Sequence, residues 1–385
     1  MRIKMPQLKI GDLVAKLPIV QGGMGVGISL SGLASTVANE GGIGVLSAVG
    51  LGVLRKGKTK EEDNLALRDE IRKTRKLTDG IIGLNVMVAL TNFDDLVCTA
   101  LNEKIDVLFM GAGLPLKMPK MIDNEFLNET KTKFAVIVSS ARAAKVIFKT
   151  WAKKFSHVPD AVVVEGPKAG GHLGFTIEQI EDENFKLEKL VPEIVAAIKP
   201  FEEKFNKKIP LIAGGGIYSG KDIKDIMDLG ADAVQLGTRF VTTTECDASD
   251  EFKQSFIDCK EEDIVLIKSP VGLPGRAIKN DFLTKVYSGI TTPFSCPWKC
   301  LITCDYKTAP YCIAIALLNS KLGNLKNGFA FAGSNAFLCD KVISVKELME
   351  TLQDEYSAAL KLFINSCRTE ALVGCLNFLR ALSSI

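Results

Sequence analysis

The segment AVVVEGPKAGGHLGF, residues 161–175, carries the side chain best suited to proton transfer in this chain. A short apolar run leads to the adjacent glycines Gly170 and Gly171 and then to His172, one of only two histidines. An imidazole titrates near neutral pH and can accept a proton from a weakly acidic carbon. The alternative is that His172 only hydrogen-bonds backbone or coordinates an ion. Its place on a glycine-lined loop after a buried strand favours a catalytic or substrate-contacting role.

Two later segments are suited to bind a phosphate group. LIAGGG (211–216) and QLGT (235–238) each place glycine directly after an apolar run. The backbone N–H groups of Gly215, Gly216, Gly237 and Thr238 could hydrogen-bond an anion, and a following helix N-terminus would add electrostatic attraction. Loops after the seventh and eighth strands commonly form the phosphate site of a (β/α)8 barrel.

Two other glycine-rich segments superficially resemble nucleotide-binding motifs. GGMGVGISLSG (22–32) fits the dinucleotide pattern G-x-G-x-x-G in no register, and no acidic residue ends a following strand where one is expected. GVLRKGKT (52–59) fits the phosphate-loop pattern G-x-x-x-x-G-K-[ST], with Lys58 as the lysine. However, the loop is apolar, and no apolar strand ends in an aspartate that would hold magnesium. Nucleotide hydrolysis is therefore disfavoured.

Four cysteines, Cys296, Cys300, Cys304 and Cys312, lie close together in the sequence. On a helix the first three would share one face and could hold a metal or an iron–sulfur cluster. Their spacing matches none of the C-x2-C patterns that identify such sites, and reduced cysteines pack as small apolar residues. Packing is the favoured interpretation, so no metal site is predicted, although the role of these cysteines stays open. The second histidine, His157, is predicted to lie on the surface.

The elements that must position these residues follow a repeating pattern. Eight short apolar runs alternate with amphipathic stretches such as 29–41, 64–79, 140–154 and 219–230. Continuous apolar runs are typical of parallel strands buried on both faces. Eight strand–helix repeats over about 240 residues predict an α/β (β/α)8 TIM barrel, with an open doubly wound sheet as the alternative. The eight runs are 18–23, 43–48, 81–87, 107–113, 134–140, 161–166, 211–216 and 233–238.

The carboxyl ends of all eight strands would meet at one rim, where barrel enzymes place their chemistry. These ends are rich in glycine, which allows backbone to approach a flat or phosphorylated ligand closely. The strand–helix rhythm stops after residue 240, and SPVGLPGRAIKN (269–280) is typical of a loop. We therefore predict a barrel over residues 1–285 and a cysteine-rich, mostly helical extension over residues 286–385 that packs on the barrel.

Composition excludes several classes of protein. The 385 residues are 47% hydrophobic and 24% charged, with a net charge of +3, so a large core is expected and disorder is not. The sequence contains no basic tract of the kind that would indicate nucleic-acid binding. The N-terminus lacks the apolar core of a signal peptide, and no apolar run is long enough to span a bilayer. These features predict a cytoplasmic protein with reduced cysteines and no membrane or nucleic-acid partner.

PIVQGGMGVGISLSGLASTVANEGGIGVLSAVG, GLNVMV, VVVEGPKAGGHLG and LIAGGGI…ADAVQLGTRF resemble the nitronate monooxygenase family, formerly the 2-nitropropane dioxygenases. The resemblance covers roughly residues 6 to 285 and implies a TIM barrel with non-covalently bound FMN. It implies that His172 is the base that removes the α-proton of a nitroalkane, or contacts the bound nitronate, with O2 reoxidising the flavin. The residues that it implies for cofactor binding are Gly22, Gly23, Met24, Asn85, Glu165, Gly170, Gly215, Gly216, Gln235, Leu236, Gly237 and Thr238.

The same segments are also similar to FMN-dependent enoyl-acyl-carrier-protein reductases. Glu165 followed by GGH resembles those reductases more than the nitronate monooxygenases, which often have glutamine at this position. RAIKN (276–280) resembles the reductases too. An NAD(P)H-dependent enoyl-thioester or quinone reductase therefore stands as the alternative function, and a non-catalytic or iron–sulfur scaffold as a third. Use of NAD(P)H, the physiological substrate and the oligomeric state are left open.

Overall fold

A computed structural model describes residues 2–55, 57, 59–296 and 298–382, with side chains up to residue 366. Eight parallel strands form one sheet in the order β3-β11-β10-β8-β7-β6-β5-β4. Seven of the eight predicted apolar runs contain one of these strands, and the run 134–140 overlaps β7, which begins one residue earlier. The strands are β3 (Ile19–Gln21), β4 (Gly44–Ser47), β5 (Ile82–Met87), β6 (Val107–Gly111), β7 (Lys133–Val138), β8 (Ala161–Glu165), β10 (Leu211–Gly214) and β11 (Ala233–Leu236).

The sheet closes on itself between its first and last strands. Val20 forms a parallel bridge with Ile43, the Ile43 N–H donates to the Ile19 carbonyl at 2.9 Å, and the Gln21 N–H donates to the Ile43 carbonyl at 3.0 Å. The fully buried Gln21 side chain extends this seam, because its Oε1 accepts from the Val45 N–H at 3.0 Å. Closure confirms the predicted TIM barrel and excludes the open doubly wound sheet.

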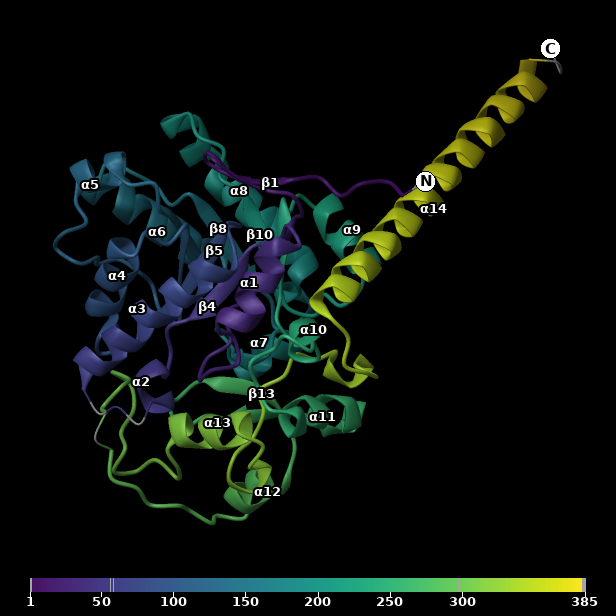
Figure 1. Cartoon of the computed structure of the whole chain (residues 1–385). Helices are drawn as coiled ribbons and strands as arrows, with labels where there is room; N and C mark the ends of the chain where they lie inside the picture. The colour runs from purple at the N-terminus through teal and green to yellow at the C-terminus, as the bar shows by residue number, and fades with distance from the viewer. Residues whose placement is uncertain (1, 56, 58, 297, 383–385) are drawn as a thin grey trace.

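Helices lie around the outside of the barrel (Figure 1). The four predicted amphipathic stretches overlap α1 (Ser31–Asn39), α3 (Lys60–Leu77), α6 (Ala141–Lys154) and α9 (Gly220–Asp228), and only α3 begins before its predicted stretch. The start of α9 follows the sequence signal, since the Ser219 hydroxyl accepts from the Asp222 N–H at 3.2 Å. Its end does so too, because Gly230 has φ +110° just past the last turn.

The remaining elements include further helices packed around the barrel, such as α4 and α8, and the elements at its ends. The hairpin of β1 and β2 contributes Leu8, Ile10 and Ala15 to the apolar cluster that fills the barrel interior. These elements are β1 (Leu8–Ile10), β2 (Leu13–Ala15), α2 (Leu51–Leu54), α4 (Phe93–Asn102), α5 (Asn124–Glu129), β9 (Gly171–His172), α7 (Ile177–Glu181), η1 (Glu183–Phe185), α8 (Leu187–Phe205), α10 (Thr238–Val241), α11 (Asp250–Asp258), η2 (Glu261–Asp263), β12 (Ile264–Lys268), β13 (Pro274–Ile278), α12 (Asp281–Tyr287), α13 (Ile313–Lys321), η3 (Leu325–Asn327), η4 (Ala336–Leu338) and α14 (Val345–Leu382).

After β11 the structure differs from the sequence-based prediction in two segments: one predicted loop forms a strand, and the cysteine segment forms no helix. Residues 274–278, predicted as loop, form β13, the centre of a three-stranded antiparallel sheet with β12 and β9. The cysteine segment around 296–304 is irregular, so the shared helical face considered for three of its cysteines does not exist. The helical C-terminal region is confirmed: α14 packs against α9 and α1 and then projects from the body (Figure 1). The domain boundary at residue 285 stays a prediction.

Close packing between α1 and β4 generates the first testable prediction. A Cβ atom at position 44 would lie 1.8 Å from the Ala34 carbonyl oxygen, a backbone atom that cannot move aside without displacing α1. We expect Gly44→Ala to lower the free energy of unfolding by about 3 kcal/mol, measured by urea denaturation. Gly25→Ala is the matched control, because its Cβ first meets the Val49 side chain at an ordinary 3.4 Å. Equal losses in the two variants would contradict this packing.

Candidate active site

A cavity of about 600 Å³ lies at the carboxyl-terminal rim of the barrel. The structure brings every predicted site residue to its wall, although they are spread over more than 200 positions of sequence. The rim of a TIM barrel is where such convergence is expected. The predicted residues in the wall are Gly22, Gly23, Met24, Asn85, Glu165, Gly170, His172, Gly215, Gly216, Gln235, Leu236, Gly237 and Thr238.

In the part of the cavity wall that follows β3 and β5, the backbone of the β3 loop lies very close to neighbouring side chains. A Cβ atom on Gly23 would lie 2.5 Å from the Cβ of Asn85, and one on Gly22 would lie 3.2 Å from the Gln235 side chain. Both positions therefore need glycine if Asn85 and Gln235 are to keep their places. The loop is also held from behind, because the Met24 N–H donates to the Ser29 hydroxyl at 2.9 Å.

The wall after β10 and β11 has the backbone required for an anion site. Gly215 and Gly216 have φ values of +106° and +81°, a conformation that favours glycine. A Cβ on Gly216 would lie 2.9 Å from the Lys168 side chain, which also lines the cavity. Lys168 forms no ion pair with any described acidic residue. Sequence reasoning missed this cation, although it stands four residues before His172 in the segment 161–175 that was singled out.

A segment from the far end of the chain completes the same wall. The Gly333 N–H donates to the Thr238 hydroxyl at 3.0 Å, and the Asn335 amide donates to the Gly216 carbonyl at 2.7 Å. A Cβ on Gly170 would lie 2.6 Å from the Gly333 nitrogen. No local sequence pattern predicts this contact, because it joins segments about 100 to 160 residues apart.

His172 is held by the small sheet rather than by the barrel. Its strand β9 pairs with β13, so that His172 lies opposite Gly275. Its Nε2 lies 2.7 Å from the Ser269 hydroxyl, and its ring meets the Phe331 ring edge-on at 5.0 Å. Burial lowers the pKa of His172 to about 4. The imidazole is therefore neutral at pH 7 and is a weak base, contrary to the prediction that it titrates near neutrality.

Arg276, on β13, fixes the loop that carries His172. Its guanidinium donates to the carbonyl oxygens of Pro167 at 2.5 Å and Ala169 at 2.8 Å. The side chain is buried and makes no ion pair with a described carboxylate. This interaction explains why RAIKN and AGGH occur together, since one segment positions the other.

Glu165 ends β8 inside the cavity. No hydrogen bond or ion pair to its carboxyl group is formed by the described residues, and the side chain is only partly accessible. Burial alone raises the pKa of Glu165 to about 7. The cavity therefore contains two titratable groups whose pKa values are displaced in opposite directions, a pattern typical of functional sites.

The rejected motif and the second histidine have structural roles. The Gly52 N–H donates to the Asp63 carboxylate at 2.8 Å, so an acidic group occupies the position that a phosphate would need. Lys58 lies outside the described residues. His157 is half-buried rather than on the surface, and burial followed by the nearby Lys207 ammonium lowers its pKa. It does not line the cavity.

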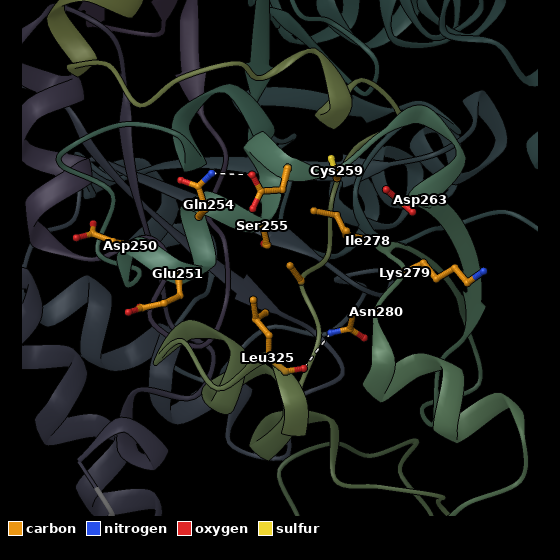
Figure 2. A pocket seen from close by; sticks show the side chains of 12 residues that line it. Asp250, Glu251, Gln254, Ser255, Cys259, Asp263, Ile278, Lys279, Asn280 and Leu325 are labelled. Carbon is orange, nitrogen blue, oxygen red and sulfur yellow. Dashed lines mark hydrogen bonds between the residues drawn. The ribbon is translucent and has the colours of Figure 1, made fainter.

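A second cavity of about 610 Å³ lies between α11, β13 and η3 (Figure 2). Its wall includes the acidic residues Asp250, Glu251, Asp258 and Asp263 and none of the predicted site residues. These carboxylates would repel a phosphorylated ligand. The rim cavity is therefore the candidate active site.

The closed barrel and the cavity at its rim define a TIM-barrel enzyme. A model of the family described as nitronate monooxygenase matches residues 7–105 and 90–355, and the chain belongs to this family. It is accordingly an enzyme of the oxidoreductase class. No helix in the described part of the chain has the length and apolarity to cross a membrane.

Three similar proteins illustrate the range of this family. A probable nitronate monooxygenase of Staphylococcus haemolyticus is 27% identical over 323 residues, covering 74% of this chain and 81% of the relative. A Mycobacterium tuberculosis (3aS,4S,5R,7aS)-5-hydroxy-7a-methyl-1-oxo-octahydro-1H-indene-4-carboxyl-CoA dehydrogenase is 26% identical over 291 residues, covering 75% and 70%. The solved structure of FabK from Thermotoga maritima has a TM-score of 0.70 and 27% identity, covering 91% and 96%.

The buried carboxyl group of Glu165 leads to a prediction about stability. Its pKa in the folded protein, about 7, lies above the usual value of about 4.3, so the folded state binds more protons between these values. Its contribution to stability therefore falls as the pH rises toward 7 and stays lost above 7. We expect Glu165→Gln to stabilise the cofactor-free protein by about 2 kcal/mol more at pH 8 than at pH 5, measured by denaturant unfolding. A gain that does not change with pH would contradict burial of an ionisable carboxyl group.

Proposed function

We propose that this protein is an FMN-dependent oxidoreductase that oxidises nitronates with O2. The observation that carries the proposal is the single cavity into which the residues expected to bind FMN and substrate all converge. The walls fit such a cofactor, because glycine replaces a side chain at each point where backbone must approach a flat ring or a phosphate. The turned backbone at Gly215 and Gly216 and the Lys168 side chain in the same wall support this fit.

The cavity divides into two parts that match the two ends of FMN. Gly216, Gln235, Leu236, Gly237 and Thr238 would hold the phosphate, with Gly215 beside them and Lys168 as the counter-charge. Gly22, Gly23, Met24 and Asn85 would contact the isoalloxazine ring, and Glu165 and Gly170 would lie near the ring and ribityl chain. When bound, FMN supplies the electron acceptor for the substrate and passes the electrons to O2.

The two titratable groups in the cavity, His172 and Glu165, suggest different roles toward the substrate. Neutral His172, anchored to Ser269 and packed on Phe331, would contact the bound nitronate without titrating. Glu165, whose pKa lies near 7, is better matched to take a proton from a neutral nitroalkane. We therefore move the role of base from His172 to Glu165 and keep His172 as a substrate contact. The apolar side chains around both would limit access of water.

An NAD(P)H-dependent enoyl-thioester or quinone reductase is the second candidate. The similarity to Thermotoga maritima FabK and to the mycobacterial indene-carboxyl-CoA dehydrogenase favours it, as does glutamate at position 165. Anaerobic titration of the purified protein distinguishes the two. Rapid bleaching of flavin absorbance by a nitronate with little response to NADH or NADPH supports our proposal, and the reverse result supports the reductase.

The assignment of the base makes a prediction about substrate charge. We expect Glu165→Gln to lower kcat/KM for a neutral nitroalkane by about 100-fold, because only this substrate needs a base, and to lower it much less for the pre-ionised nitronate. For the wild-type protein, kcat/KM for the nitroalkane should rise with pH to a plateau above about 7, where Glu165 is ionised.

His172→Ala is the matched comparison for that experiment. It should lower kcat/KM for both substrates to a similar extent, because both need the contact. If His172→Ala instead affected only the neutral nitroalkane, His172 would be the base and our assignment would be wrong.

The proposed phosphate site makes an independent prediction. We expect Lys168→Met to weaken binding of FMN by about 10-fold, the usual effect of losing one charge-assisted hydrogen bond, and to leave binding of riboflavin unchanged. Fluorescence titration of the cofactor-free protein measures both. Lys189→Met, which removes an exposed lysine of α8 that does not line the cavity, is the control. Equal losses for FMN and riboflavin would place Lys168 away from the phosphate.

A further inference from the structure

The segment between α12 and α13 is long, has no regular secondary structure in its described residues and is attached to the body by few contacts. Residues 289–310 contain neither helix nor strand apart from a single bridge between Leu301 and Leu90, and none of the described residues in this range is buried. Loops of this length without structure of their own are uncommon in compact proteins. Only a few hydrogen bonds attach this one, including the Trp298 indole to the Gly57 carbonyl at 2.8 Å. Three of the four cysteines, Cys296, Cys300 and Cys304, lie in this segment. All three are only partly buried, and Cys304 packs at the edge of an apolar cluster.

The structure gathers these four cysteines into one group. Cys296, Cys304 and Cys312 all lie close enough to the Cys300 sulfur to interact with it electrostatically, and Cys296 and Cys312 also interact with Cys304. The nearest regular element is α13, whose first turn follows Cys312 directly. The group thus joins three cysteines of the irregular segment to one at the start of a helix.

Backbone N–H groups point at two of the sulfurs. The Lys299 N–H donates to the Cys296 sulfur at 3.3 Å, and the N–H groups of Ala314 and Ile315, in the first turn of α13, lie near the Cys312 sulfur. Hydrogen bonds of this kind stabilise negative charge on sulfur and are a recurring feature of metal–thiolate sites. Lys299 has φ +43°, so the turn that presents its N–H is an unfavourable one for this residue.

The arrangement of the four thiols distinguishes two kinds of metal centre. As they stand, no three described cysteine, histidine, aspartate or glutamate side chains are arranged to hold a single metal ion. A zinc ion requires four sulfurs at about 2.3 Å from one point. An iron–sulfur cluster is larger, and its cysteine ligands stand correspondingly farther apart. Thiols that interact with one another but cannot share one ion fit a cluster better.

We propose that Cys296, Cys300, Cys304 and Cys312 bind an iron–sulfur cluster. Four thiolates are the usual ligand set of such clusters. The cluster would fasten the irregular segment 289–310 in place of an apolar core. It would also lie beside the rim cavity, because Trp298, Cys300 and Leu301 form part of the cavity wall. The proposal does not depend on the identity of the substrate.

The test is the metal content of the full chain purified without oxygen from iron-supplemented cells. We expect about four iron and four acid-labile sulfide per chain. A paramagnetic resonance signal of a reduced cluster should appear after dithionite treatment, which distinguishes the cluster from flavin absorbance. The Cys300→Ser and Cys304→Ser variants should lose the iron and the signal, whereas Cys98→Ser, which changes a half-buried cysteine of α4, should keep both.

Four results would overturn the proposal. They are one zinc per chain, a disulfide among the four cysteines, no bound metal after anaerobic reconstitution with iron and sulfide, and iron retained equally in the Cys300→Ser and Cys304→Ser variants. The second of these variants keeps the test decisive if the first does not fold, because Cys304 lies on an irregular, largely exposed stretch. A variant is informative when its circular dichroism spectrum matches that of the wild-type protein.

Discussion

The buried Gln21 side chain is the interaction on which the rest of the structure depends. It stands where β3 ends, and its amide accepts from Val45 on β4 while donating to the Ser29 hydroxyl at 2.9 Å. The first contact continues the seam that closes the sheet, and the second orients the loop that begins with Gly22. A polar side chain with no solvent exposure must satisfy both ends of its amide. Gln21 therefore couples barrel closure directly to the shape of the rim cavity.

Closure then determines which chemistry the rim can support. A closed parallel barrel brings all eight carboxyl ends to one face, so backbone from distant segments can surround one ligand. The same enclosure removes water from Glu165 and His172, and loss of solvent disfavours the charged form of each. Near pH 7 His172 is therefore uncharged and Glu165 is about half ionised, and the Lys168 side chain supplies a cation beside Gly216. This charge distribution suits a phosphorylated cofactor with an uncharged ring.

The sequence predicted the barrel well because each of its signals is local. Continuous apolar runs identify parallel strands buried on both faces, and Ser219 and Gly230 mark the ends of α9 without reference to the rest of the chain. The convergence of the rim glycines also follows from strand order alone. What the sequence could not show depends on long-range register. The two-residue strand that holds His172 exists only because β13 pairs with it, and Asn335 reaches Gly216 from 119 residues away.

Properties set by burial were predicted least well. His172 was expected to titrate near neutrality from its ordinary pKa, but the Phe331 ring and the cavity wall shift it to about 4. The most direct test of the account is to denature the purified protein and identify the released chromophore by chromatography. Our account predicts one FMN per chain, released without a covalent bond to the protein. A protein without flavin, or one that carries FAD or a covalently attached flavin, would contradict it.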